Sequence, residues 1–482
     1  MSMIQTMEEL LNLIKHPLTD TDRMRTMQAY EFARKYHEGQ KRNSGEPYVE
    51  HVVAVAKNCA ELGMDVDTII GALLHDTLED TDATEQEIRD LFGESVLFLV
   101  KGVTKLGKLK YQGKDRHVES LRKFFVAIAE DLRVLIIKLA DRLHNAATLE
   151  HVRADKRRRI ALETIEVHAA LAGRLGMEEL KGRLEDYAFP YAYPDEHART
   201  TSIMAEIVPE SQTAISYAHT RIDETLKDFA ISGAVVSSRI KHTYSTYRKL
   251  AKYHWNTELV YDIVALRVLV PTIPDCYQVL GLIHMLWKPI PKRIKDYIAL
   301  PKPNGYQSIH TTVITEHGVV EIQIRTHEMH QEAEMGVASH FAYKESQFTG
   351  NTVVKSKKFN WIDELKELHS VVSDPSRFLE ELKLDFFTNR IFVFTPQGDV
   401  IDLPEGASPI DFAYAVHSAI GDRASGAKAN GKMISLGDAL HNGDIVEIIT
   451  SKHAHPGTKW LDYAKTSFAR KKIRHYLSES HT

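Results

Sequence analysis

The segment Gly71–Asp80, GALLHDTLED, ends an apolar run with one imidazole and three carboxylates. In a single helix, residues four apart share a face, so His75 would lie beside Glu79. Asp76 would lie beside Asp80 in the same way. A core helix has no packing reason to gather these groups, because burying unpaired charge is costly. The alternative is a solvated helix end, and we predict instead two metal ligands followed by two proton-accepting carboxylates.

Two further fragments carry ligand chemistry. The fragment PYVEH places His51 at the start of the apolar helix VVAVAKNCAEL. The fragment LIIKLADRLHNAATL places Asp141 and Asn145 four residues apart, on one helix face. Together the three fragments supply two imidazoles and two carboxylates, those of His51, His75, Asp76 and Asp141. Such a nitrogen and oxygen set suits manganese, iron or zinc.

The order His, His-Asp, Asp on predicted helices resembles the HD metal-dependent phosphohydrolases. The longer pattern HDTLED, with GQKRNSGEPYVEH before it and KLADRLHN after it, resembles the hydrolase domain of the RelA/SpoT alarmone enzymes. A bound Mn²⁺ would lower the pKa of water, and Glu79 with Asp80 would take the proton. The resemblance also implies a guanosine-nucleotide site formed by Arg42, Ser44, Asn145 and Thr148.

A second group of charged residues follows later in the chain. We expect SRIKHTYSTYRKLAKYH to form one helix, with a basic face of Lys241, Ser245, Arg248, Lys249 and Lys252. A solvated surface is the alternative for such a face. The run YDIVALRVLVP predicts a strand buried on both faces that opens with Asp262. The run VVEIQIRT alternates, so Glu321, Gln323 and Arg325 should share one sheet face.

Between these predicted strands lies the basic loop WKPIPKRIKDYIALPKPNGYQSIHTT, which would suit a polyphosphate. The whole region resembles the RelA/SpoT synthetase domain, which moves pyrophosphate from ATP to the 3′-hydroxyl of GDP or GTP. The resemblance implies that Asp262 holds Mg²⁺, that Glu321 activates the hydroxyl and that Tyr306 stacks on guanine. It assigns ATP binding to Arg239, Lys241, Ser245 and Lys249. It places around the acceptor nucleotide Lys295, Lys302, Asn304, His310 and Gln323.

The last region, RIFVFTPQGDVIDLPEGASPIDFAYAVHSAIG and onward, predicts strands around a helix capped by Ser408 with Pro409 at its first position. It resembles a TGS domain, a small β-grasp module that in long RelA/SpoT proteins meets uncharged tRNA on the ribosome. His417 occupies the position of a contact histidine in that family.

The fold class expected is therefore multidomain. An all-α HD hydrolase domain (residues 1–195) precedes an α/β, nucleotidyltransferase-like synthetase domain (196–345), with a hinge from Phe189-Pro190 to Pro194-Asp195. A linker with connecting helices (346–387), a TGS domain (388–450) and a basic helix (451–482) complete the chain. The 482 residues suffice for two to four domains.

Composition narrows the class of protein. The formal charge of −5 gives no global field for nucleic acid, so any anion site must be local. The two cysteines, Cys59 and Cys276, are far apart, which suits a reduced compartment. No apolar stretch reaches the roughly 18 residues of a membrane span, and the start of the chain lacks a signal peptide's pattern. We predict a cytoplasmic protein.

The motif Arg293-Ile294-Lys295-Asp296 matches the RxKD form of bifunctional family members. Other positions depart from the family, since SRIKH stands where GRPKH is common, and Ala147 and Gly173 replace an arginine and a histidine. The favoured hypothesis is an enzyme that both makes and breaks (p)ppGpp. One alternative is a hydrolase whose second domain only senses nucleotide, and another is a non-enzymatic RNA-binding protein. Because two opposed reactions would waste ATP, we predict that nucleotide at one site disfavours the other, through helices between Ala161 and Tyr193.

Overall fold

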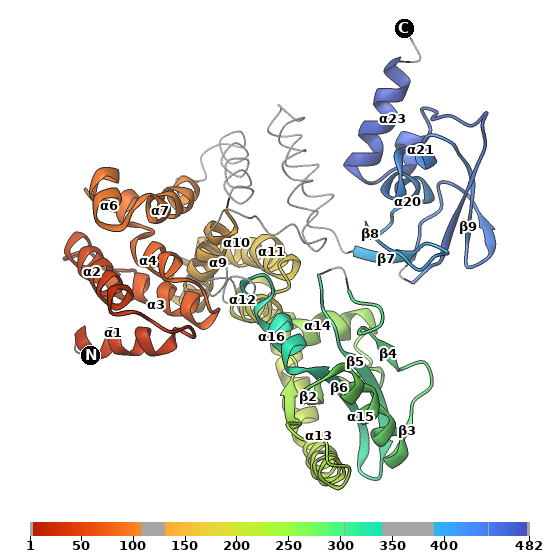
Figure 1. Cartoon of the computed structure of the whole chain (residues 1–482), viewed down its shortest axis with the longest axis horizontal. Helices are drawn as coiled ribbons and strands as arrows, with labels where there is room; N and C mark the ends of the chain where they lie inside the picture. Colours follow the sequence, from red (N-terminus) through yellow and green to blue (C-terminus); the bar gives the residue numbers. More distant parts are fainter. Residues whose placement is uncertain (1–2, 108–130, 303, 340–389, 442, 480–482) are drawn as a thin grey trace. The chain divides into compact units, whose positions relative to one another are not determined.

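The computed structural model describes residues 3–107, 131–302, 304–339, 390–441 and 443–479 (Figure 1). The chain divides into two compact units. Of the described residues, the first unit holds those up to residue 339 and the second holds those from residue 390 onward. The predicted linker at 346–387 lies outside the described residues.

The N-terminal part of the first unit is helical, as predicted. Side-chain caps begin several of its helices: Thr19 and Thr84 form capping boxes with Asp22 and Glu87, and Asp65 caps the helix that leads to His75. The elements are α1 (Met3–Leu13), α2 (Asp20–Tyr36), α3 (Tyr48–Glu61), α4 (Val66–Leu74), α5 (Thr77–Asp80), α6 (Glu85–Phe92), α7 (Glu94–Gly107), α9 (Leu132–Ala147), η1 (Leu149–His151), α10 (Ala154–Glu163), the π-helical turn η2 (Thr164–Ala169), α11 (Ala170–Arg174) and α12 (Glu178–Ala192). Helices α3, α4 and α9 contribute almost wholly buried faces and form the core that carries the ligand residues.

The prediction of one helix over GALLHDTLED is wrong. Helix α4 ends at Leu74, and the short helix α5 starts at Thr77. The His75 ring bonds to the Ala72 carbonyl at 2.8 Å, and the Thr77 hydroxyl donates to the Leu74 carbonyl at 2.6 Å. These side chains engage carbonyls that a continuing helix would use for its own backbone bonds, so the helix breaks at the ligand pair.

The predicted hinge is shorter than expected. Helix α12 continues through Pro190 to Ala192, and the long helix α13 (Pro194–Asp228) begins with Pro194 in its first turn, where the missing amide proton costs nothing. The break is therefore confined to Tyr193.

The second half of this unit is a mixed sheet. Its elements are β1 (Val235–Ile240), α14 (Thr243–Lys252), η3 (Thr257–Leu259), β2 (Val264–Val270), α15 (Ile273–Leu286), β3 (Lys288–Pro289), β4 (Lys295–Asp296), β5 (Ile309–Thr315), β6 (Gly318–Thr326) and α16 (His327–Met335). The strand order is β1-β2-β6-β5-β3, with β4 also paired to β5. Strands β2 and β6 are parallel, and the other pairs are antiparallel.

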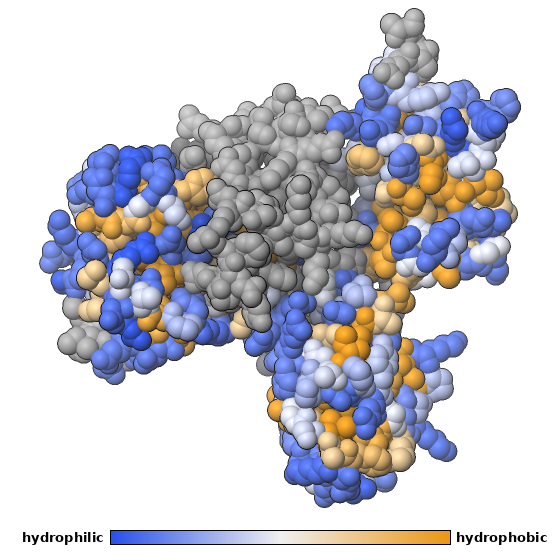
Figure 2. Space-filling model, in the orientation of Figure 1, coloured by the Kyte–Doolittle hydropathy of each residue, from blue (hydrophilic) through white to orange (hydrophobic). Residues whose placement is uncertain are grey.

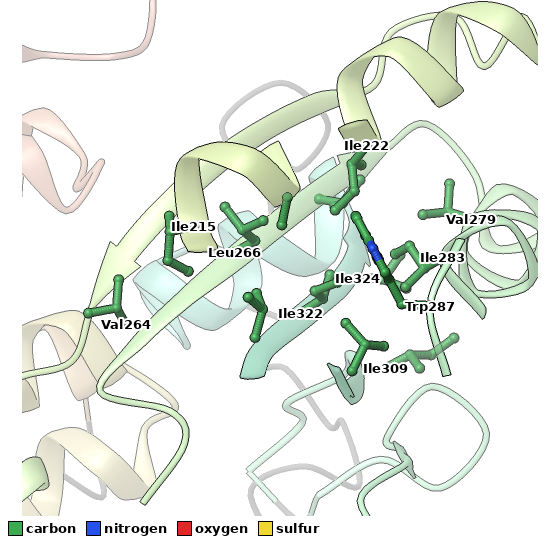
Figure 3. Packing of buried hydrophobic residues seen from close by; sticks show 14 of the residues in the cluster. Ile215, Ile222, Val264, Leu266, Val279, Ile283, Trp287, Ile309, Ile322 and Ile324 are labelled. Carbon is green, nitrogen blue, oxygen red and sulfur yellow. The ribbon is translucent and has the colours of Figure 1, made fainter. Parts of the chain in front are cut away.

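Alternation along the strands separates a packed face from a polar face. Helices α13 and α15 pack apolar side chains against β2 and β6 (Figure 3). The helices contribute Ile215, Ile222, Val279 and Ile283, and the strands contribute Leu266, Ile322 and Ile324. Val320, Ile322 and Ile324 are completely buried, which confirms the predicted alternation of β6. Glu321, Gln323 and Arg325 consequently lie on the opposite face.

The prediction that SRIKHTYSTYRKLAKYH forms one helix is wrong at its start. Residues 235–240 form β1, in which Arg239 is paired with Ala265 of β2, and α14 begins only at Thr243. The β-branched residues Val235, Val236 and Ile240 favour the strand. Arg239 therefore belongs to the sheet and Lys241 to the connection that follows it.

The second unit contains β7 (Arg390–Phe394), β8 (Val400–Pro404), α20 (Pro409–Val416), α21 (Ser418–Gly421), β9 (Ala424–Ala429), β10 (Lys432–Ile434), β11 (Val446–Thr450), α22 (Trp460–Tyr463) and α23 (Ser467–Glu479). The predicted cap is confirmed, because Ser408 and Asp411 form a capping box and Pro409 is in the first turn of α20. Strand β9 pairs with β10 and β11, and the basic helix expected at the end of the chain is α23.

Hydrophilic residues are spread over every coloured part of the surface in Figure 2. Among the described residues, no helix combines the length and the apolar character that crossing a membrane requires. Cys59 and Cys276 are buried free thiols. The predicted cytoplasmic location stays a prediction.

Candidate functional site

Four of the predicted metal ligands meet at one buried point between helices. His51 lies in the first turn of α3, His75 ends α4, Asp76 precedes α5 and Asp141 lies on α9. One ligand atom each from His51, His75 and Asp141 lie within 4.8 Å of one another. The Asp76 Oδ2 atom is 3.0 Å from His75 Nε2 and 3.5 Å from His51 Nε2.

Both imidazoles direct their Nε2 atoms toward these carboxylates. His75 Nδ1 bonds to the Ala72 carbonyl, so Nδ1 carries a proton, and the buried Nε2 atom faces Asp76 Oδ2. His51 Nδ1 lies 2.9 Å from His144 Nδ1, a nitrogen that also accepts from Arg42 Nη1 at 2.9 Å. His51 Nδ1 is therefore a donor, and its Nε2 lone pair faces Asp141 Oδ1 at 3.4 Å.

The carboxylates of this cluster favour a positive charge between the side chains. Burial alone would lower the pKa of His75, but the nearby Asp76 and Asp141 carboxylates raise it to about 9. Asp141 also accepts from Lys138 at 2.7 Å and from Asn145 at 2.5 Å. Either a proton or a metal cation would compensate the negative charge of the two carboxylates. The ligand atoms that converge from four side chains fit a divalent cation.

The two predicted proton acceptors lie on α5. The Tyr48 hydroxyl is 2.7 Å from Asp76 Oδ2 and 3.2 Å from Asp80 Oδ2, so Tyr48 links Asp80 to the ligand cluster. Asp80 is exposed, and Glu79 before it is half-buried. Because the helix breaks before α5, the expected side-by-side placement on one continuous helix does not apply.

Three of the four predicted nucleotide residues are joined beside the ligands. Arg42 donates to Asn145 Oδ1 at 2.5 Å and to Thr148 Oγ1 at 3.3 Å. Ser44 is not joined to them in the described contacts, since it lies in the turn before α3 and its hydroxyl donates to Glu46 at 3.1 Å.

The second site is a cavity of about 380 Å³ over the polar face of the sheet. Most of the residues predicted for this site line the cavity. They are Arg239, Lys241, Ser245, Lys249, Asp262, Lys295, Lys302, Tyr306, His310, Glu321 and Gln323. Asn304 lies outside the lining, and its amide donates to Glu178 at 3.2 Å. The lining includes eight basic and five acidic side chains, so the cavity favours an anionic ligand.

Two lysine side chains hold the Asp262 carboxylate of this cavity. It accepts from Lys241 at 2.6 Å and contacts Lys249. Burial raises the pKa of this carboxyl, but the two ammonium groups outweigh burial and bring it to about 2. Asp262 is therefore ionised at neutral pH and suits a hard cation such as Mg²⁺.

Comparison with known proteins identifies the lineage. A model described as HD domain matches residues 29–178, one described as region found in RelA / SpoT proteins matches 238–348, and one for the TGS domain matches 391–450. The chain is 46% identical over 474 residues to the guanosine-3′,5′-bis(diphosphate) 3′-pyrophosphohydrolase of Aquifex aeolicus, covering 98% of this chain and 67% of that protein. The chain belongs to the RelA/SpoT family.

Two further relatives carry names for synthesis. The bifunctional (p)ppGpp synthase/hydrolase SpoT of Escherichia coli K12 is 45% identical over 472 residues, which cover 98% of this chain and 67% of that protein. A GTP pyrophosphokinase of Myxococcus xanthus is 45% identical over 471 residues, covering 96% of this chain and 61% of that protein. The chain thus spans 61–67% of the length of these three relatives.

Several residues of this RelA/SpoT chain were missed by sequence reasoning. His144 and Tyr48 stand within the quoted motifs, but only their contacts reveal that they orient His51 and Asp76. Glu178, Glu179 and Lys181 of α12 line the synthetase cavity although they lie far from it in sequence. No local pattern could have indicated that approach. The TGS residue His417 caps α21 by accepting from the Ala419 amide at 3.1 Å.

Proposed function

We propose that this RelA/SpoT chain is a bifunctional alarmone enzyme. Its HD domain removes the 3′-pyrophosphate of (p)ppGpp to give GDP or GTP. Its synthetase domain transfers pyrophosphate from ATP to the 3′-hydroxyl of GDP or GTP. The observation that carries the proposal is that two separate sites, one with four convergent metal ligands and one with a basic cavity, are both complete in their main residues.

In the hydrolase site the protein holds the substrate and moves the proton. A bound divalent cation, which we propose to be Mn²⁺ held by the four ligands, would acidify water. Glu79 and Asp80 accept the proton, and Tyr48 keeps Asp80 close to the ligands. Arg42, aligned by Asn145, contacts the guanosine nucleotide together with Thr148, and Ser44 would reach it only after leaving Glu46.

In the synthetase site the cavity positions two nucleotides. Arg239, Lys241, Ser245 and Lys249 bind ATP, and Asp262 would hold Mg²⁺. Tyr306 stacks on guanine, while the acceptor phosphates meet Lys295 and Lys302, with Asn304, His310 and Gln323 around them. Glu321 takes the proton of the 3′-hydroxyl. The 3′-oxygen then bonds to the β-phosphorus of ATP, the bond from that phosphorus to the α-phosphate oxygen breaks, and AMP leaves.

The departures from the family motif do not change this assignment. Ser238 and Ile240, the two positions at which SRIKH differs from GRPKH, are not among the described residues that line the cavity. Ile240 is 56% exposed on an edge strand. The charged neighbours of these two positions, Arg239 and Lys241, both line the cavity.

The test uses one preparation and two assays. Incubation with ATP and GDP should yield AMP and ppGpp. Incubation of ppGpp with Mn²⁺ should yield GDP and pyrophosphate, and chelator should stop that release. Failure of either reaction under these conditions would remove the bifunctional proposal.

We also propose that the TGS unit contacts tRNA on the ribosome. The support is its family, its exposed His417 and the basic helix α23. Binding of uncharged tRNA that weakens steeply with salt is expected, and His417→Ala should reduce it. Equal binding by the variant at all salt concentrations would count against this contact.

A further inference from the structure

A series of hydrogen-bonding groups in the synthetase cavity joins the stacking tyrosine to the proton acceptor. The Tyr306 hydroxyl lies 2.8 Å from His310 Nε2. On the other side of the ring, His310 Nδ1 lies 3.5 Å from Glu321 Oε1. The side chains of His310 and Glu321 are only 18% and 15% exposed, so water competes little for these contacts.

The sheet fixes the geometry of this series. His310 of β5 is paired directly with Gln323 of β6, and Glu321 is two residues from Gln323 on the same face. Such diagonal neighbours are within reach of long side chains. Lys295 of β4 is paired with His310 on its other side, so pairing with two strands fixes the backbone that carries the imidazole.

The direction of each hydrogen bond follows from the chemistry of the partners. A carboxylate only accepts, so the proton of the neutral imidazole is on Nδ1, and Nε2 accepts from the Tyr306 hydroxyl. Burial lowers the pKa of His310 and keeps the ring neutral. The 3.5 Å separation is long, as catalytic contacts often are before substrate binds.

The two side-chain contacts that Glu321 makes with described residues go to the same oxygen. Gln323 Nε2 donates to Oε1 at 3.2 Å, and His310 addresses the same atom. This arrangement fixes the carboxylate plane and leaves Oε2 as the oxygen to receive a proton. A general base acts only from within hydrogen-bond reach, about 2.6–3.2 Å, of the proton that it takes, so a fixed plane favours the reaction.

The stacking end of the series is also restrained. The Lys302 ammonium lies 4.6 Å from the centre of the Tyr306 ring, and the Arg325 guanidinium lies 5.9 Å from it. The Arg325 side chain is 1% exposed. A purine stacked on Tyr306 would therefore fix a ring whose hydroxyl is already engaged with His310.

We propose that His310 is a positioning residue that transmits guanine stacking on Tyr306 to the orientation of Glu321. The Tyr306 hydroxyl then serves proton transfer, while its ring serves binding. This inference rests on the proposed pyrophosphate transfer and assigns the guanine base a role in aligning the proton acceptor.

Tyr306→Phe in the full chain separates the two roles. Because the ring remains, the KM for GDP and the GDP dissociation constant should stay within about twofold. The lost hydrogen bond should lower kcat about tenfold. Tyr306→Ala should raise the KM as well, since stacking is lost. Tyr217→Phe is the matched control, because it removes a tyrosine–carboxylate contact with Glu316 outside the cavity.

His310→Asn tests the series independently. It keeps a donor near the Nδ1 position but loses the imidazole nitrogen that accepts from Tyr306, so kcat should fall. The double variant with Tyr306→Phe should lose no more than His310→Asn alone, because both changes break one series. Retained ppGpp hydrolysis and an unchanged melting temperature show that each variant is folded.

The outcomes distinguish failure of the positioning role from failure of the proposed ppGpp synthesis. If the unaltered chain makes no ppGpp from ATP and GDP, the proposed function fails. If that chain is active but Tyr306→Phe keeps its kcat, or changes only the KM, the positioning role is overturned. Additive losses in the double variant would overturn it as well.

Discussion

At the scale of single residues, the hydrogen bond made by Nδ1 of each imidazole determines whether Nε2 is available to a metal ion. His51 and His75 can offer Nε2 only while Nδ1 donates elsewhere, to His144 and to the Ala72 carbonyl. Partners of this kind typically change metal affinity 10- to 100-fold. His144 also accepts from Arg42, so one side chain serves both the ligand cluster and the nucleotide residues.

His144→Ala should therefore weaken Mn²⁺ binding by about 10- to 100-fold. The variant frees the His51 ring to adopt the other tautomer without removing a ligand. Equilibrium titration of the metal-free protein with Mn²⁺ measures the effect. His151→Ala, at an exposed histidine on η1, is the control and should bind Mn²⁺ normally. Equal affinities in the two variants would contradict the role of His144.

A sequence predicts those features of a site that depend on nearby residues better than those that depend on contacts between distant residues. The types and order of His51, His75, Asp76 and Asp141 predicted the cluster that the structure assembles. The break at His75 was missed, because it depends on side chains engaging helix carbonyls. The strand at Arg239 was missed too, because pairing with a distant strand overrides a helical pattern.

Helix α12 matters at the scale of elements, since it follows the HD ligands and also borders the synthetase cavity. Asp186 of α12 bonds to His242 Nδ1 at 2.7 Å and accepts from the Tyr244 amide at 3.0 Å. Glu179 lies 3.4 Å from His242 Nε2. Helix α12 is thus tied to the start of α14, which carries Lys249 and Ser245.

This junction should make stability depend on pH. Hydrogen bonds from His242 to Asp186 and Glu179 raise its pKa to about 9, above the ordinary value of about 6.5. A raised pKa means that protonated His242 stabilises the fold fully below pH about 6.5, and that this stability is lost as the pH rises through about 9. The melting temperature of His242→Asn should fall below that of the original chain at pH 6, with the gap closing by pH 10. A gap independent of pH would refute the ionic role.

A glycine next to α16 allows two backbone segments to approach closely. The Val337 amide donates to the Leu175 carbonyl at 2.8 Å, and a Cβ on Gly336, whose φ is +56°, would lie 2.1 Å from that carbonyl oxygen. No L-residue fits there without displacing the chain.

Gly336→Ala should destabilise the protein by more than about 1 kcal/mol. Thermal unfolding measures the change, with ppGpp synthesis as a second readout because α16 lines the cavity. Gly281→Ala in α15 meets nothing within 4 Å and should raise stability by up to about 1 kcal/mol. Similar melting temperatures for both variants would mean that the close approach carries no strain.

At the scale of the whole molecule, one chain carries two sites with opposed chemistry. The predicted antagonism between them stays a prediction, and α12 is the element with contacts to support it, because it packs on α9 of the hydrolase and on α14 and α16 of the synthetase. If binding is linked, GDP at one site must alter ppGpp affinity at the other by a reciprocal factor. Paired titrations in which neither ligand affects the other would exclude binding linkage.

The most direct test is a separation of the two reactions within one chain. Asp141→Asn should lower pyrophosphate release from ppGpp by about 100-fold or more, since a charged ligand is lost, while synthesis from ATP and GDP persists. Glu321→Gln should lower synthesis by about 100-fold or more and leave hydrolysis intact. Hydrolysis that survives Asp141→Asn, or loss of both reactions in either folded variant, would contradict the account of two separate catalytic centres.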